Sequence, residues 1–99
     1  MHTIYKYAIP IDDRFTINLP QGAQLLSVQA QHDTPCIWAL VDPSAPIEAR
    51  SFRLAGTGHP IHDNELEGTF KHVGSFQMRG GALVFHLFEV SHAPGTARH

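Results

Sequence analysis

The stretch that decides the predicted fold runs from Gln24 to Val41 and reads QLLSVQAQHDTPCIWALV. Its first half alternates between apolar and polar side chains, with Leu26, Val28 and Ala30 on one face and Ser27, Gln29 and Gln31 on the other. A period of two is typical of a β-strand with one buried face. The segment HDTP then predicts a turn, and residues 36–41 are apolar on both faces. The stretch therefore predicts a hairpin whose second strand is either a central strand covered on both sides or a strand whose outer face meets another subunit.

Most of the remaining sequence has the same period. Alternating segments occur at residues 2–9, 14–20, 48–56, 68–78 and 82–90. Prolines or glycines interrupt the chain between them, and no window has apolar residues at helical spacing beyond a single turn around Asp63 to Leu66. The Gly80-Gly81 pair between the last two segments suits a tight hairpin turn, because glycine adopts positive φ values readily.

These segments predict an all-β fold, a small antiparallel sandwich or barrel of six to seven short strands. We expect one domain over residues 1–90, followed by a flexible tail over residues 91–99. A chain of 99 residues buries only about 60–65% of its unfolded surface, so its margin of stability is thin. Together with the doubly apolar strand at residues 36–41, this small size favours a homo-oligomer.

The charge and the cysteine content exclude several classes of protein. Seven Lys and Arg stand against nine Asp and Glu, and no basic run occurs, so a polymeric nucleic acid is not an expected partner. The longest apolar runs are far shorter than a membrane span, and the first residues do not read as a signal peptide, so we expect no membrane partner and a cytoplasmic location. Cys36 is the only cysteine, which excludes an intrachain disulfide and a cysteine-based zinc site and favours a buried thiol.

A second informative stretch, GTGHPIHDN at residues 56–64, has the chemical groups of a small phosphate site. It combines amides that can approach an anion closely, a hydroxyl and an imidazole, which come from Gly56, Gly58, Thr57 and His59. Arg53 precedes the stretch by three residues, and its guanidinium can bind two phosphate oxygens at once. We therefore predict that these residues bind a small anionic ligand.

A ligand with a nucleobase would also need an aromatic platform. Trp38 is the first candidate, and Tyr5, Tyr7 and Phe70 are others. Arg50 should not share the site, because it lies on the opposite face of its strand from Arg53. The predicted ligand-binding residues are Arg53, Gly56, Thr57, Gly58, His59 and Trp38. We expect them to bind a nucleotide-type signal, such as a cyclic or modified nucleotide, without turnover and without a cofactor.

Two other classes of function stay open. An interaction or virion module would present a flat apolar patch. A small hydrolase or metalloprotein could draw metal ligands from His59, His62, Asp63, His72 and His86, and hydroxyl nucleophiles from Ser27, Ser51, Thr57 and Ser75. Neither set carries a motif such as HExxH or GxSxG, and Pro60 prevents the helical spacing that would bring His59 and His62 to one face. We therefore expect no catalytic residue and no metal site.

Three strings of the sequence carry a family resemblance: INLPQGAQLLSVQAQHDTPCIWALVDPSAP, RSFRLAGTGHPI and GSFQMRGGALVFHLFE. They cover most of residues 3–89, and WALVDP and GTGHPI are the most unusual parts. In these strings the chain resembles a family of short β-proteins encoded in bacteriophage and prophage genomes. The resemblance implies the cytoplasm of a bacterial host as the location. Small phage proteins are often inhibitors of host defence, including ones that sequester nucleotide signals, so the resemblance favours binding over catalysis by analogy.

Overall fold

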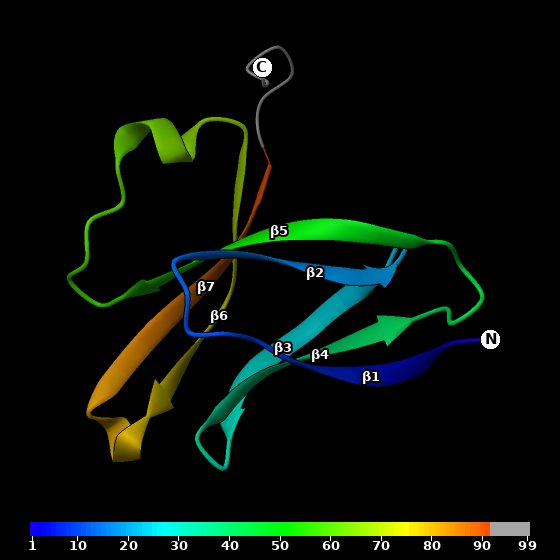
Figure 1. Cartoon of the computed structure of the whole chain (residues 1–99), viewed down its shortest axis with the longest axis horizontal. Helices are drawn as coiled ribbons and strands as arrows, with labels where there is room; N and C mark the ends of the chain where they lie inside the picture. Colours follow the sequence, from blue (N-terminus) through cyan, green and yellow to red (C-terminus); the bar gives the residue numbers. More distant parts are fainter. Residues whose placement is uncertain (92–99) are drawn as a thin grey trace.

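The computed structural model describes residues 1–91 and contains seven strands (Figure 1). The strands are β1 (Thr3–Ala8), β2 (Arg14–Pro20), β3 (Gln24–Gln31), β4 (Thr34–Val41), β5 (Ile47–Gly56), β6 (Thr69–Met78) and β7 (Leu83–Ser91). The helical segments of the described residues are two short 3-10 turns, η1 (Asp63–Leu66) and η2 (Arg79–Gly81). Each alternating segment of the sequence forms a strand, so the all-β prediction is confirmed, as is the predicted turn at η1.

The strands form two antiparallel sheets, one with the order β1-β4-β3 and one with the order β2-β5-β7-β6. The β3–β4 and β6–β7 hairpins both point downward in Figure 1. The edge strands β3 and β6 are in contact and join the two sheets along one side. The shortest Cα extent of the molecule is 16 Å, which has room for two layers about 10 Å apart. Of the two architectures that the sequence allowed, the structure is therefore the sandwich.

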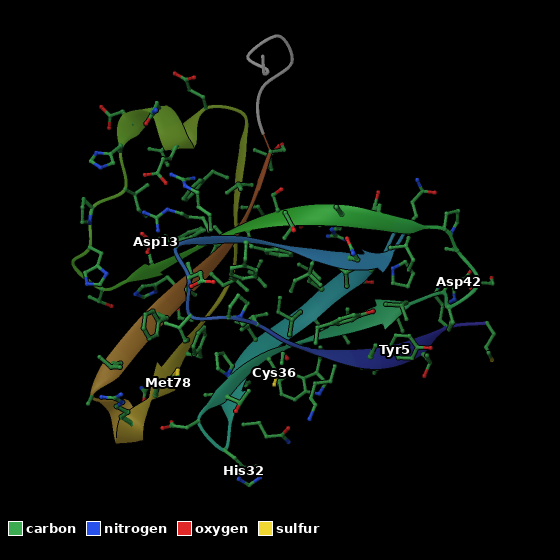
Figure 2. All side chains as sticks on the ribbon, viewed as in Figure 1. Tyr5, Asp13, His32, Cys36, Asp42 and Met78 are labelled. Carbon is green, nitrogen blue, oxygen red and sulfur yellow. The ribbon has the colours of Figure 1, made fainter. Side chains whose placement is uncertain are left out.

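The core lies between the two sheets and follows the predicted alternation. Its largest fully buried side chains are Leu19, Ile37, Val41, Phe52 and Leu87. Full burial of an apolar side chain of this size contributes about 1.5–3 kcal/mol. β4 is the central strand of its sheet, as one of the two alternatives for residues 36–41 predicted, but its outward residues Trp38 and Leu40 are only half-buried. Cys36 on this strand is a free, buried thiol (Figure 2).

A glycine permits the close contact between β6 and β3. Gly74 follows a bulge in β6, where the pairing with β7 shifts between His72 and Gly74. A Cβ atom at Gly74 would lie 2.8 Å from Cγ1 of Val28, which is a buried core residue of β3. Any larger side chain would therefore push the two sheets apart at this point.

The side chain of Arg50 connects β5 with β7 and with the residue before β3. Arg50 on β5 donates to both carboxylate oxygens of Glu89 on β7, at 2.6 and 2.8 Å, and to the carbonyl oxygen of Ala23 at 2.5 Å. The hydrogen bond with Glu89 raises the pKa of Arg50. Arg50 thus has a structural set of partners on the face opposite to Arg53, which agrees with the predicted alternation along β5.

Two further expectations concern the C-terminal tail and a membrane-spanning segment. Ser91 ends β7, and the rest of the predicted tail, residues 92–99, lies outside the described residues. Within residues 1–91 no helix has the length and apolar character that a membrane span requires.

Candidate functional site

The candidate site lies on the face of the β2-β5-β7-β6 sheet that points away from the core. Phe52, Leu54 and Leu87 point into the core, so the residues that alternate with them point outward. The register sets these outward residues in rows across β5, β7 and β6: Arg53, Phe88 and His72 form one row, and Ala55, His86 and Ser75 form the next. Residues that are far apart in the sequence therefore meet on this face.

Four side chains form a continuous hydrogen-bonded chain, which we call the hydroxyl–imidazole chain (His72, Ser75, His86 and Thr57). Oγ of Ser75 lies 3.2 Å from Nε2 of His72 and 2.7 Å from Nδ1 of His86. Oγ1 of Thr57 lies 2.7 Å from Nε2 of His86. His86 is half-buried, and the other three residues are exposed. The chain is therefore accessible to a ligand.

The chemistry of imidazole limits how protons are arranged in this chain. A neutral imidazole donates from one ring nitrogen and accepts at the other. If Nδ1 of His86 accepts from Ser75, then Nε2 donates to Thr57, and Ser75 can accept from His72. If the direction is reversed, Thr57 donates to Nε2, Nδ1 donates to Ser75, and Ser75 donates to His72. Every hydroxyl and ring nitrogen that joins the chain is satisfied in both directions.

Loop 57–68 crosses this outer face and covers Arg53, which is only 6% exposed. Arg53 donates from Nε to Oε1 of Glu65 at 2.6 Å. It also donates from Nη1 to the carbonyl oxygen of Leu54 at 2.6 Å and from Nη2 to that of Pro60 at 3.1 Å. All three guanidinium nitrogens are thus bound within the protein. Arg53 holds the loop to β5 in this structure, rather than presenting a free fork to solvent.

The carboxylate of Glu65 is the centre of this attachment. Besides Arg53, it accepts from the backbone amide of His62 at 2.9 Å and pairs with Nη2 of Arg14 at 2.8 Å. These contacts, the hydrogen bond from Arg53 first among them, lower the pKa of Glu65 to about 2. The attachment, which we call the loop clamp (Arg53, Glu65 and Arg14), is therefore fully charged at neutral pH.

The first residues of the loop form a tight turn after β5. The amide of Thr57 donates to the carbonyl oxygen of Val84 at 3.1 Å, and the amide of His59 donates to that of Gly56 at 3.0 Å. Gly58 has a φ of +88°, which glycine adopts without strain. A Cβ atom at Gly56 would lie 2.9 Å from Nδ1 of His59, so this glycine makes room for the imidazole ring. The amides of Thr57 and His59, two residues of the predicted phosphate site, thus already have partners within the protein.

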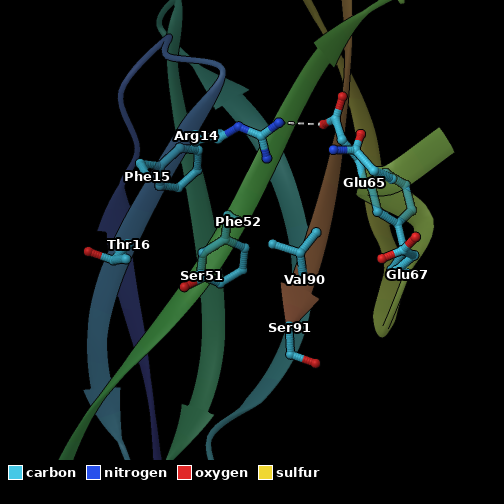
Figure 3. A pocket seen from close by; sticks show the side chains of 11 residues that line it. Arg14, Phe15, Thr16, Ser51, Phe52, Glu65, Glu67, Val90 and Ser91 are labelled. Carbon is cyan, nitrogen blue, oxygen red and sulfur yellow. Dashed lines mark ion pairs between the residues drawn. The ribbon is translucent and has the colours of Figure 1, made fainter. Parts of the chain in front are cut away.

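A cavity of about 450 Å³ lies between loop 57–68 and the outer face of the sheet (Figure 3). Its lining includes the hydroxyls of Thr16, Ser51 and Ser91, the side chains of Phe70 and Val90, and the charged groups of Arg14, Glu65 and Glu67. The Arg14–Glu65 ion pair crosses one end of the cavity in Figure 3. The volume falls in the range of small-molecule sites.

Aromatic side chains connect the cavity with the hydroxyl–imidazole chain. The rings of Phe70 and Phe88 are 4.5 Å apart between centroids, and the rings of Phe88 and His72 are 5.4 Å apart. Phe70, one of the aromatic residues considered from the sequence, therefore lies at the site. Trp38 lies instead on the outer face of the other sheet, because it alternates with the buried Ile37 and Ala39.

The structure thus brings the predicted ligand-binding residues together only in part. Thr57 joins the hydroxyl–imidazole chain, Gly56, Gly58 and His59 form the adjoining turn, Arg53 belongs to the loop clamp, and Trp38 is remote. That they bind a ligand stays a prediction. The sequence offered Ser75 only as one of several hydroxyls, and His72 and His86 only as scattered metal ligands. Within residues 1–91, no three His, Cys, Asp or Glu side chains are grouped so that they could hold a metal ion.

The fold and the site define a small antiparallel β-sandwich with an exposed hydroxyl–imidazole chain on one sheet. Residues 1–97 match the sequence profile of a family described as "Domain of unknown function (DUF7352)", and the chain belongs to this family. No curated protein and no solved structure matches the chain.

Proposed function

We propose that this protein binds a small anionic ligand on the outer face of the β2-β5-β7-β6 sheet. The observation that carries the proposal is the convergence of two hydroxyls and two imidazoles, from Thr57, Ser75, His72 and His86, at distances of 2.7–3.2 Å. Each group can redirect a hydrogen bond toward an anion that approaches from solvent. An oxyanion such as phosphate has enough acceptor oxygens to take several of these donors at once.

The distribution of charge favours the anion at the hydroxyl–imidazole chain rather than in the cavity. The cavity is lined by the carboxylates of Glu65 and Glu67 and by the guanidinium of Arg14. Arg14 is already paired with Glu65, so an anion in the cavity would face Glu67 without a free cation beside it. The chain itself has only hydroxyls and imidazoles as members. We therefore propose that the anionic group binds at the hydroxyl–imidazole chain.

The cavity suits the uncharged part of the same ligand. Its hydroxyls can bind polar atoms of a ring, and Phe70 and Val90 give it an apolar wall. Because Phe88 contacts both Phe70 and His72, the cavity and the chain form one continuous surface. A nucleotide has the matching parts, a phosphate and a planar base. In a phage context, such binding would sequester a nucleotide-type signal in the cytoplasm of the host.

Calorimetry with AMP, cyclic AMP, inorganic phosphate and uncharged adenosine tests the proposal. We expect AMP or cyclic AMP to bind more tightly than adenosine. His86→Ala and Ser75→Ala should each weaken that binding about tenfold or more, the effect of losing one charge-assisted hydrogen bond. His2→Ala and Ser27→Ala, which lie outside the site, are the matched controls and should bind as the unmodified protein does. Absence of binding by all three anions would overturn the proposal.

A second candidate function is an interaction module, and a specific surface favours it. On the outer face of the β1-β4-β3 sheet, Ile4 pairs with Leu40 and Lys6 pairs with Trp38. Ile4 is 56% exposed, and Trp38 and Leu40 are only half-buried. This apolar patch lies on the opposite side of the sandwich from the hydroxyl–imidazole chain, so both functions are compatible with one molecule.

A further inference from the structure

We propose that Ser75 is a nucleophile, activated by His86 and positioned by Thr57, that reacts with small carboxylic esters and fluorophosphonates. This activity goes beyond the proposed binding, and it departs from the expectation that the sequence contains no catalytic residue. The arrangement required for nucleophilic catalysis is a hydroxyl within hydrogen-bond reach of a base that a third group orients in turn. Ser75, His86 and Thr57 occupy these three positions, with both hydrogen bonds at 2.7 Å.

The backbone holds the three residues in this arrangement. Ser75 and His86 are directly opposite each other in the antiparallel pairing of β6 and β7. Thr57 is fixed next to β7 by the hydrogen bond from its amide to Val84, at 3.1 Å. Two of the three groups thus project from paired strands, and the third from a turn bonded to one of them. A site on a sheet is held more rigidly than one on free loops.

The two nitrogens of His86 have separate roles in the reactive state. When Nδ1 accepts the proton of Ser75, Nε2 carries the ring hydrogen and donates it to Oγ1 of Thr57. The hydroxyl of Thr57 can accept this hydrogen, so the contact permits the tautomer in which Nδ1 is the base. His72 lies on the other side of Ser75 at 3.2 Å, where a ring N–H can donate to Oγ while the proton of Ser75 moves to His86.

With p-nitrophenyl acetate as substrate, the step is an acyl transfer. Oγ of Ser75 forms a bond to the carbonyl carbon, its proton moves to Nδ1 of His86, and the bond from that carbon to the p-nitrophenolate oxygen breaks. The proton on His86 passes to solvent with the departing phenolate. In the second step Nδ1 takes a proton from water as the hydroxide attacks the acetyl carbon. The bond from that carbon to Oγ then breaks, His86 returns the proton to Ser75, and the acetic acid that leaves loses its own proton to solvent.

The absence of a charge on Thr57 limits the rate. A carboxylate in that position would stabilise the imidazolium that forms during attack, whereas a hydroxyl only orients the ring. We therefore expect acylation of Ser75 to be readily measured and hydrolysis of the acyl-serine to be slow. The expected kinetic signature is a burst of p-nitrophenolate, of about one equivalent per protein, followed by slow turnover.

Mass spectrometry after treatment with a fluorophosphonate tests the assignment directly. Trypsin cleaves after Lys71 and Arg79 and releases the peptide HVGSFQMR, in which Ser75 is the only hydroxyl. We expect the label on this peptide, no label there in Ser75→Ala, and a labelling rate lowered about 100-fold or more in His86→Gln. Thr57→Val should slow labelling, and Thr57→Ser should restore it because the hydroxyl returns. Ser27→Ala is the matched control and should label as the unmodified protein does.

Several outcomes would overturn the inference. They are an unlabelled peptide 72–79, labelling of Ser75 that does not change in His86→Gln, or equal labelling of Ser27 and Ser75. A denaturation curve of each variant verifies folding, and the Thr57→Val and Thr57→Ser pair decides the outcome if His86→Gln does not fold. A protein that binds AMP but is not labelled contradicts only this inference. A protein that is labelled but binds none of the anions contradicts only the proposed function.

Discussion

Two arginines share one carboxylate oxygen of Glu65 and differ in burial, so they offer a direct comparison. The side chain of Arg53 is 8% exposed and that of Arg14 is 61% exposed. Removing one partner of a buried ion pair leaves an uncompensated charge and costs about 3–5 kcal/mol, whereas an exposed pair contributes about 0–1 kcal/mol. We expect Arg53→Leu to lower the free energy of unfolding by about 3 kcal/mol and Arg14→Leu by less than about 1 kcal/mol, measured by urea denaturation. Equal losses in the two variants would contradict this assignment.

Gly74 provides a second prediction for a single residue. Its missing Cβ would lie 2.8 Å from Cγ1 of Val28, so Gly74→Ala should destabilise the fold by about 1–3 kcal/mol through overpacking. Val28→Ala removes the atom that would clash. The double variant should therefore lose less stability than the sum of the two single variants, which a double-mutant cycle measures. If the losses of stability in the two single variants add up to the loss in the double variant, the contact with Val28 is not the reason for a glycine at position 74.

Loop 57–68 is the element whose attachment depends on pH. The pKa of Glu65 is lowered from its ordinary 4.5 to about 2, so the folded protein binds a proton there less readily than the unfolded chain does. For a lowered pKa, the stabilisation is complete above about pH 4.5 and is lost as the pH falls toward 2. We expect urea midpoints of the unmodified protein to fall over this window more steeply than those of Glu65→Gln.

The comparison with Glu65→Gln isolates one carboxyl group. Hydrogen bonds from Ser44 also lower the pKa of Asp42, but this group contributes equally to both proteins and cancels in the difference. Asp42→Asn is the control. Because it keeps the Glu65 carboxylate, its urea midpoint should still fall more steeply between pH 4.5 and 2 than that of Glu65→Gln. Parallel curves for the unmodified protein and Glu65→Gln would argue against the loop clamp.

The strands could be predicted from the sequence because their physical signal is local. Apolar and polar residues alternate in all of them except β4, and turn-forming residues stand between them, so a window of a few residues is enough. The central position of β4 was also predictable, since residues 36–41 are apolar on both faces. The order of the strands was not, because pairs such as β1 with β4 and β5 with β7 join distant segments.

The candidate site depends on that order, and for this reason the sequence indicated only parts of it. Alternation places Ser75 and His86 on faces of their own strands, but only the register of β6 with β7 sets them opposite each other. The burial of Arg53 has a similar cause, since its partner Glu65 comes from a loop whose path has no periodic signal. The sequence did predict that Arg50 and Arg53 lie on opposite faces of the sheet, because the alternation of side chains within one strand is enough to show this.

At the scale of the whole molecule, the two outer faces of the sandwich differ in character. One carries the exposed hydroxyl–imidazole chain, which includes Thr57, the first residue of loop 57–68. The other carries the apolar patch of Ile4, Trp38 and Leu40, in which Lys6 is hydrogen-bonded to Gln31 at 2.8 Å. A stable dimer buries about 800 Å² per partner, which is a modest share of the 6220 Å² surface of this chain. A second copy on the apolar patch would leave the opposite face open to ligand.

We therefore predict a homodimer through the outer face of the β1-β4-β3 sheet. Ile4→Lys should convert it to a monomer, because a charge would enter an apolar interface without a partner. Ile47→Lys is the matched control, since Ile47 is also a solvent-exposed isoleucine, 62% against 56% for Ile4, but lies on β5 of the other sheet. Light scattering at micromolar concentration measures the masses, and Trp38, the only tryptophan, should fluoresce at shorter wavelength in the dimer. A small domain gains stability from association, so the thermal midpoint should also rise with protein concentration. A monomeric mass for the unmodified protein, or equal effects of the two substitutions, would exclude this interface.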